Sequence, residues 1–488
     1  MRSHPTSSRW LLALAAAAVT AAHPSLAAGP TLTAAEVTTA VEAAAMALGG
    51  DDLAIAVVDR AGRPLAVFSR SSATDAARDA ALGLARTGAL FSNDQAPLSS
   101  RTVAFISAPH FPPTIKNTAS GALFGIESTN RGCDLDAAYL PGQDVPPATG
   151  FLGGPGTGPV TRPGGVPLFK VDPMTGMPGA TRVVGGIGVA VDPVLATPAA
   201  DAAHEYAAFT ALASGFAPRV SKPGVIFLDG IRLPFVAQTR RPAGFPAGSL
   251  AGAYDLGPVD GGMVPDGYLV GPDAGSLLTS AEVDAVIAAA VTTASRTRAA
   301  IRLPVGSRTR MTIAVADTDG TVLGLFRMPD TTVFSVDVAV TKARNVAWFS
   351  SSARPASDLP GVPPGVAVTN RTIGFGSQPF FPSGIDGTRP GPFRNLFLFD
   401  RANPCTQGGQ PAGPNQSGIV FFPGSAPLYR NGALVGGLGV SGDGVDQDDY
   451  VTAAGAARFA APASLRADRI SIRGVRLPYW KFPRNPTK

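Results

Sequence analysis

The chain of 488 residues is an internal duplication, and this feature constrains its fold most. "LTAAEVTTAVEAAA" from Leu32 returns as "LTSAEVDAVIAAAV" from Leu278, and "IAVVDRAGRPLAVFSR" returns as "IAVADTDGTVLGLFRM". Further along, "VVGGIGVAV" answers "LVGGLGVSG", and "VIFLDGIRLPFV" resembles "RISIRGVRLPYW". Because the matching segments occur in the same order in both halves of the chain, they indicate two copies of a single domain. We therefore expect a first copy over 29–241, a linker over 242–276 and a second copy over 277–488.

Each copy gives the same order of elements. A helix begins at a Leu-Thr pair, and a glutamate three residues after the threonine completes a capping box: Thr33 with Glu36, and Thr279 with Glu282. Two strands joined by an Asp-x-x-Gly turn follow, with Asp59 and Asp317 as the turn residues. Next come an Ala-rich helix (about 78–91 and 336–349), a Gly/Pro-rich insertion (about 93–165 and 352–425), a strand pair and a last helix. Sequential hairpins with helices between them predict an α+β fold, an antiparallel sheet flanked by helices.

A glycine motif near the C-terminus resembles a nucleotide-binding turn. Gly437, Gly439 and Gly442 have the G-x-G-x-x-G spacing, which would place a pyrophosphate at a helix N-terminus. Four carboxylates follow at that point: Asp443, Asp446, Asp448 and Asp449. The first copy has Val191 in place of the third glycine. The pattern therefore predicts a glycine-rich strand over 435–440, with the acids capping the next helix.

The N-terminus indicates export. Arg2 and Arg9 precede the apolar run "WLLALAAAAVTAA", which is too short to span a bilayer comfortably. The small residues around Ala27 are typical of a signal-peptidase cleavage site. We therefore expect 1–28 to be the signal peptide of a periplasmic or secreted protein. A retained N-terminal anchor is the alternative. No later segment approaches a membrane span. The formal net charge is only +5, and no basic run alternates with aromatic residues, which argues against nucleic acid as a partner.

Several of these landmarks resemble the GlcG/HbpS family, whose members are described as haem-binding or haem-degrading. The Leu-Thr helix start, "VADTDGTVLGLFRM", "DVAVTKA" and "GGLGVSGDGVDQDDYVTAAG" carry the resemblance, and the second copy is the closer one. The resemblance implies a small sheet flanked by helices, oligomeric assembly and an exported protein that binds haem or another small ligand. A haem-degrading enzyme is one alternative, although no catalytic constellation is visible. A structural or sensor-partner protein without a cofactor is the other.

The candidate ligand-binding residues follow from that resemblance. C-x-x-C-H and zinc spacings are absent, so the metal ligands stay unknown. Arginines that recur in both copies could hold a haem propionate in bidentate fashion, and the alternative is a structural Arg–Asp pair within each copy. An axial ligand could be Tyr450, which recurs as Tyr206, or His204, and for each the alternative is a residue of helix packing or capping. The predicted cofactor-binding residues are Arg327, Lys342, Arg371, Tyr450, Arg101 and His204, with the ligand in the second copy.

Each insertion also contains one cysteine, Cys133 in the first copy and Cys405 in the second. An exported protein exposes free thiols to oxidation, so we expect the two to form a disulfide. Equivalent residues meet in this way only near a symmetry axis. The cysteines therefore predict that the copies pack as an intrachain pseudo-twofold dimer whose insertions meet. Two separately buried thiols are the alternative.

Overall fold

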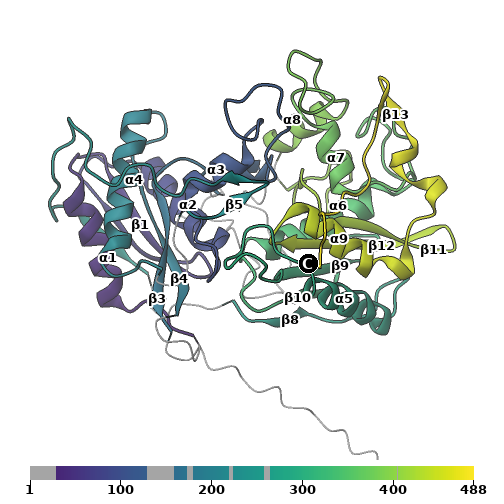
Figure 1. The fold of residues 1–488 in the computed structure, drawn as a ribbon, viewed down its shortest axis with the longest axis horizontal. Coiled ribbons are helices and arrows are strands. Elements are labelled where there is room, and N and C mark those ends of the chain that lie inside the picture. Colours follow the sequence, from purple (N-terminus) through teal and green to yellow (C-terminus); the bar gives the residue numbers. More distant parts are fainter. Residues whose placement is uncertain are drawn as a thin grey trace, which may run out of the picture.

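The computed structural model describes residues 29–128, 159–172, 180–218, 224–257, 264–403 and 405–487. The proposed signal peptide over 1–28 and Cys133 lie outside these residues. Figure 1 shows the first copy (purple to teal) beside the second copy (green to yellow). None of the helices in the described ranges is long and apolar enough to cross a bilayer.

The first copy and the linker contain the following elements. The first copy has α1 (Ala34–Ala47), β1 (Ala54–Asp59), β2 (Pro64–Ser69), α2 (Asp75–Phe91), α3 (Ser100–Ser107), η1 (Ile126–Ser128), β3 (Gly165–Val171), β4 (Thr181–Ala190), α4 (Pro198–Ala213), β5 (Phe227–Leu228) and β6 (Ile231–Arg232). The linker has β7 (Ala253–Leu256) and β8 (Gly267–Val270).

The second copy repeats that order. It contains α5 (Ser280–Ala294), β9 (Met311–Ala316), β10 (Val322–Arg327), α6 (Ser335–Phe349), α7 (Asn370–Gly376), α8 (Arg394–Ala402), β11 (Ser425–Arg430), β12 (Ala433–Gly442), α9 (Val445–Gly455), the 3-10 helices η4 (Ala457–Phe459), η5 (Ala463–Leu465) and η6 (Ala467–Arg469), β13 (Ser471–Ile472) and β14 (Val475–Arg476). Both predicted capping boxes at the starts of α1 and α5 are present.

Each copy is built on a five-stranded antiparallel sheet, and the two sheets have the same strand order. The first runs β3-β4-β1-β2-β7 and the second β11-β12-β9-β10-β8. The α+β class and the duplication are thus confirmed. The linker supplies the edge strand of each sheet, a contribution that the sequence did not predict. Tyr254 of β7 packs edge-on against Phe68 (ring centroids 5.0 Å apart), and Tyr268 of β8 packs against the equivalent Phe326 (5.1 Å).

Helices cover both faces of each sheet. In the first copy Ile55 and Val57 of β1 face a core shared with α1 and α4, whereas Ala54, Ala56 and Val58 face α2. This alternation is the period of two that a strand buried on both faces requires. The second copy repeats it, with α5 and α9 on one face of β9 and α6 on the other.

The glycine motif is a strand, as predicted, and its glycines permit close helix packing. A Cβ atom on Gly437 would lie 2.1 Å from the carbonyl oxygen of Ala343 in α6, and one on Gly439 would lie 2.0 Å from that of Ala339. Gly186 and Gly188 have the same relation to α2 in the first copy. The prediction that the acids cap the next helix is wrong. Helix α9 begins at Gly444 without a side-chain cap, because the carboxylates bind cations instead.

The insertions contain helices that the sequence did not predict. Helices α3 and α7 begin at Ser99 and Thr369, whose hydroxyl groups accept hydrogen bonds from backbone N–H groups in the first turn. The insertions also meet each other. The ring of His110 stacks on that of its equivalent, Phe380 (centroids 6.0 Å apart), and the Asn117 side chain accepts a hydrogen bond from the backbone N–H of Asp386.

The two copies pack against each other as an intrachain pseudo-dimer with a shared core. Phe91 at the end of α2 stacks on Phe334 before α6, with ring centroids 4.1 Å apart. A twofold axis would require the same contact between the equivalent positions, Phe349 and Ala76. Ala76 is exposed, however, and Phe349 is buried in a different cluster. The Phe91–Phe334 contact therefore departs from twofold symmetry, whereas the stacking of His110 on its equivalent Phe380 agrees with it.

Candidate functional site

Arg371 on α7 pairs with two carboxylates of α9. Its Nε donates to Asp449 Oδ2 (2.5 Å) and its Nη2 donates to Asp446 Oδ1 (2.6 Å), both on α9. The equivalent Arg101 on α3 binds Glu205 on α4 through two hydrogen bonds of 2.5 and 2.9 Å. Both arginines therefore form structural pairs within their own copies, which is the alternative that the sequence left open.

These pairs hold the closing segment of each copy in place. Asp449 Oδ2 accepts the backbone N–H of Lys481 (3.0 Å), and Glu205 Oε2 accepts that of the equivalent Ala237 (3.1 Å). Next to each arginine, the N-cap hydroxyl of the same helix donates to a carbonyl oxygen of the segment, Thr369 to Tyr479 and Ser99 to Phe235.

Lys342 lies buried on the face of α6 that packs on β12. Its Nζ donates to the carbonyl oxygen of Val440 (2.7 Å) and to Asp448 Oδ2 (3.1 Å), and it stands 5.0 Å from the centroid of the Phe422 ring. Burial lowers the pKa of Lys342, and burial raises the pKa of Asp448 to about 7. Oδ1 of Asp448 has no hydrogen-bond partner among the residues that the structure describes. The pair is thus a fully buried ionic contact.

The first copy fills the same place without an ion pair. Leu84 stands where the second copy has Lys342, and His204 stands where it has Asp448. A Cβ atom on Gly164 would lie within 3.3 Å of both side chains, just as one on Gly424 would contact Lys342 and Asp448. Burial lowers the pKa of His204 to about 4, so its imidazole is neutral near pH 7. The structure therefore places His204 inside the first copy, where it is 3% exposed.

Arg327 lies apart from this network. Its Nη1 donates to Val264 and Asp266 of the linker, and its Nη2 donates to the carbonyl oxygen of Thr331. In the first copy Ser69 is the residue equivalent to Arg327, and the neighbouring Arg70 binds the other half of the linker through Ser249 and Ala251. Among the described residues, Arg327 shares no hydrogen-bond partner with Lys342 or Arg371. The structure thus does not gather the three cations around one ligand.

Tyr450 lies next to Asp449 on α9, in an aromatic group at the C-terminal segment. Its ring packs edge-on against Phe482 (centroids 5.6 Å apart), and Trp480 lies 6.2 Å from Phe482. Phe482 is 48% exposed. Lys481, between Trp480 and Phe482 in the chain, binds Asp446 through its Nζ (2.7 Å). Sequence reasoning missed Trp480 and Phe482. The available signal was the contrast between "RLPYWKF" and "RLPFVAQ" at the ends of the two copies.

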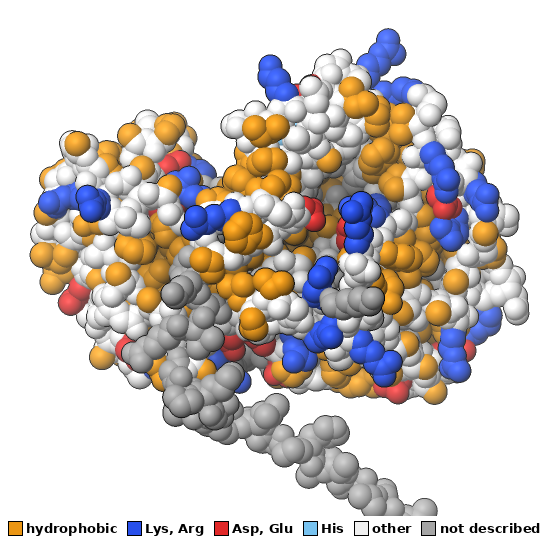
Figure 2. Space-filling view, viewed as in Figure 1, with side chains coloured by type: hydrophobic (Ala, Val, Ile, Leu, Met, Phe, Trp, Pro, Cys, Tyr) orange, Lys and Arg blue, Asp and Glu red, His pale blue; other side chains and the backbone are white. Residues whose placement is uncertain are grey.

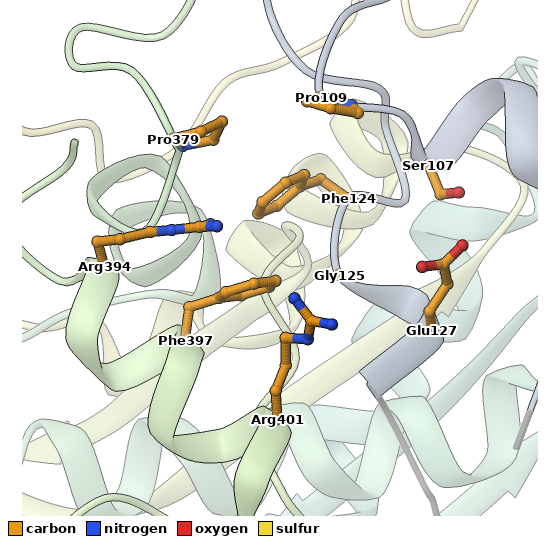
Figure 3. Close-up of a pocket in the computed structure, with 9 residues that line it drawn as sticks. All are labelled: Ser107, Pro109, Phe124, Gly125, Glu127, Pro379, Arg394, Phe397 and Arg401. Atoms are coloured by element: carbon orange, nitrogen blue, oxygen red, sulfur yellow. The ribbon is translucent and has the colours of Figure 1, made fainter. Parts of the chain in front are cut away.

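A pocket of about 250 Å³ lies between the two insertions, and we call it the inter-insertion pocket (Figure 3). One wall comes from α3 and the loop that follows it, and the other from α8 and the segment before it. The lining residues are Ser107, Pro109, Phe124, Gly125, Glu127, Pro379, Arg394, Phe397 and Arg401. The sequence signal that would have found it is "RNLFLFDRA", which places Arg394, Phe397 and Arg401 on one helix face.

No group of three or more His, Cys, Asp or Glu side chains is arranged to hold a metal ion in the described part of the chain. The predicted disulfide between Cys133 and Cys405 stays a prediction, because Cys133 falls outside that part. On the face shown in Figure 2, Lys and Arg side chains are scattered over the second copy, with acidic side chains beside several of them.

Comparisons with known proteins place a family signature on the second copy. Residues 278–457 match the family model described as "Haem degrading protein HbpS-like". No curated protein matches. Similar solved structures include Klebsiella pneumoniae protein ORFY, with 20% identity over 37% of this chain and 88% of that chain and a TM-score of 0.24. Another is a PduOC:heme complex, with 21% identity over 36% of this chain and 91% of that chain and a TM-score of 0.23. A double mutant of Streptomyces reticuli HbpS has 21% identity, 38% and 89% coverage and a TM-score of 0.23. The resemblance to the GlcG/HbpS family is thereby confirmed, and the second copy carries it.

Proposed function

We propose that this is an exported protein that binds haem or a related tetrapyrrole through its second copy. The observation that carries the proposal is the match of residues 278–457 to a family model described as haem-degrading. The match falls on the copy that has the Lys342–Asp448 ion pair, and the first copy has Leu84 and His204 in its place. Cleavage of the signal peptide belongs to the same proposal, and N-terminal sequencing of the mature protein tests it: an intact Met1 would contradict export.

The aromatic group around Tyr450 suits such a ligand in its chemistry. A tyrosine phenol is one of the groups that ligate haem iron, and aromatic rings pack against a macrocycle. Arg371 and Lys481 lie beside the rings and could pair with propionates, which would have to compete with Asp446 for them. Haem, when bound, would supply its own iron chemistry. The protein would supply the tyrosine, the flat apolar contact and the neighbouring cations.

The duplication offers a matched control for the axial ligand. Tyr450→Phe and Tyr206→Phe each remove one hydroxyl group and keep the ring in its packing. When haemin is titrated into the purified protein, we expect a Soret shift that Tyr450→Phe changes in position and weakens, and that Tyr206→Phe leaves unaltered. Absence of any Soret shift at micromolar haemin would exclude the ligand. Identical spectra for both variants would exclude Tyr450 as its site.

A second pair of variants tests which copy binds haem, rather than which atom ligates the iron. Arg371→Gln and Arg101→Gln break equivalent structural pairs, so their effects on folding are comparable and circular dichroism can monitor them. We expect only Arg371→Gln to weaken haemin binding. Equal effects would mean that the arginines act through stability alone.

Haem degradation is the second candidate, and the description of the matched family model favours it. Loss of Soret absorbance on addition of a reductant and oxygen would demonstrate turnover. A stable haem spectrum under those conditions would leave binding as the function.

A further inference from the structure

One connection of the second copy is rich in arginines that have no counterpart in the first copy. In the first copy the short segment 48–53 joins α1 to β1, and its charged residues are Asp51 and Asp52. In the second copy the longer segment 295–310 joins α5 to β9, and it contains Arg296, Arg298, Arg302, Arg308 and Arg310. Both copies form the same sheet, so the fold itself does not require these arginines.

The segment 295–310, which we call the arginine loop, directs most of its arginines outward. Arg298 and Arg308 stand opposite each other as an antiparallel bridge, and the N–H of Thr309 donates to the carbonyl oxygen of Thr297 beside them (2.9 Å). Side chains alternate between the two sides of such a ladder. Because Thr297 and Thr309 are fully buried, the outer side carries the residues between and beside them, Arg296, Arg298, Arg308 and Arg310.

No carboxylate balances these outward charges. Among the residues that the structure describes, only Arg302 of the arginine loop has a carboxylate within ion-pair distance. The C-terminal end, marked in Figure 1, lies against the loop and adds Arg484, whose carbonyl oxygen accepts from Nη2 of Arg298 (3.5 Å). Like charges that face each other on neighbouring strands are destabilising. The outer side of the loop is therefore a surface that an anionic partner would stabilise.

The tip of the arginine loop is apolar and held in place. Val305 is 86% exposed, and the N–H of Ser307 closes the turn by donating to the carbonyl oxygen of Pro304 (3.0 Å). Gln95 of the first copy supports the turn from behind, since its Nε2 donates to the carbonyl oxygen of Leu303 (2.7 Å). A loop that is already fixed loses little conformational entropy when it contacts a surface.

From these features we propose that the arginine loop docks the protein on a membrane surface that contains anionic phospholipids. The outward arginines would lie over lipid phosphates, to which guanidinium groups give charge-assisted hydrogen bonds, and Val305 would enter the boundary between head groups and acyl chains. Each basic residue near an anionic bilayer raises the affinity about fivefold. The apolar tip favours a bilayer over an acidic polysaccharide, which has no apolar layer to enter.

Co-flotation of the full chain with lipid vesicles tests the arginines. We expect binding to vesicles of equal parts phosphatidylcholine and phosphatidylglycerol, and much weaker binding to pure phosphatidylcholine vesicles or at high salt. Arg298→Gln combined with Arg308→Gln should lower the affinity for the mixed vesicles about tenfold or more. Arg240→Gln combined with Arg241→Gln is the matched control, because it removes the same charge from exposed linker residues and should leave the affinity unchanged. All these proteins share the apolar N-terminal run, so a difference between them reports on the loop.

A second pair of variants tests the apolar tip. Val305→Ser should weaken binding to the mixed vesicles about fivefold. Val194→Ser changes a 90% exposed position of the first copy and should have no effect.

Three results would overturn the proposal. Equal affinities of the two arginine double variants would place any bound vesicle elsewhere on the chain. Equal binding to mixed and to pure phosphatidylcholine vesicles would show that the arginines do not select the lipid. Equal affinities of Val305→Ser and Val194→Ser would show that the tip does not enter a bilayer, and tight binding of heparin would then identify an acidic polysaccharide as the partner instead.

Discussion

At the scale of single residues, the two copies differ in the side chains that they bury at the same place in the fold. The second copy buries Lys342 against Asp448, whereas the first buries Leu84 against a neutral His204. Burial of an ion pair carries a desolvation penalty that its mutual attraction often only offsets, so both solutions are compatible with a stable fold. Removal of one partner is different, because it leaves a buried charge alone.

This contrast predicts a strongly non-additive double variant. Lys342→Leu alone leaves the Asp448 carboxylate without its cation and should lower the free energy of unfolding by about 3–5 kcal/mol. Lys342→Leu combined with Asp448→His recreates the pair of the first copy and should be much less destabilising than the sum of the two single changes. Urea unfolding of all four proteins gives the coupling free energy. Additive losses would show that the two environments are not equivalent.

The sequence predicted the recurring arginines but not their partners. Arg101 and Arg371 stand out because each occurs at the same place in both copies. Glu205 and Asp449 lie 104 and 78 residues further along the chain, and the spacing of side chains says nothing about contacts at that range. The resemblance to the GlcG/HbpS family, which is closer in the second copy, groups Arg327 with Lys342. The fold separates them, since β10 ends at the linker and α6 packs on β12.

At the scale of elements, the packing of α6 on β12 depends on two glycines. Gly437 and Gly439 point to the same face of β12, where the backbone of α6 leaves no room for a side chain. The strand was predictable from the motif and from the missing third glycine in the first copy. The short helices of the insertions were not, because Gly/Pro-rich composition concealed them. The Ser99–Thr102 and Thr369–Thr372 capping boxes were the signal available.

We expect Gly439→Ala to destabilise the protein by about 1–3 kcal/mol, because the added methyl group would lie 2.0 Å from the carbonyl oxygen of Ala339 and force the helix away. Gly188→Ala should have a similar effect in the first copy. Gly413→Ala is the control, since its nearest contact would be 3.9 Å away and its backbone is not in the left-handed region. Thermal unfolding measures the three changes. A Gly439→Ala protein as stable as the control would mean that α6 does not pack this closely.

At the scale of the whole molecule, a polar network lies beside the shared core of the two copies. Arg302 donates to Asp443 (2.5 Å) and to Asp330 (2.6 Å), and the backbone N–H of Asp94 in the first copy donates to Asp330 (3.0 Å). Burial, and then the charge of Asp330, raise the pKa of Asp94 from 3.8 to about 7. The duplication predicted two equal sheets. It could not predict this network, because the network joins residues that lie 141 and 236 positions apart in the chain.

The raised pKa of Asp94 predicts a dependence of stability on pH. Between about pH 4 and pH 7 the folded protein keeps a proton on Asp94 that the unfolded chain has lost. The free energy of unfolding should therefore fall as the pH rises through this window, by up to about 1.4 kcal/mol per pH unit for one proton. Asp94→Asn cannot ionise, so its stability relative to the parent protein should increase from pH 4 to pH 7 and stay constant above. Parallel pH profiles in urea unfolding would contradict the shift.

The linker strands also bear on how the chain avoids aggregation. Without β7 and β8, strands β2 and β10 would stand at the sheet edges with unpaired N–H and C=O groups, which can template the addition of strands from other molecules. β7 is only four residues long, is exposed throughout and carries Asp255. A short edge with a charged side chain is a poor template for further pairing. The segment that joins the two copies therefore also closes one edge of each sheet and protects that edge from pairing with other molecules.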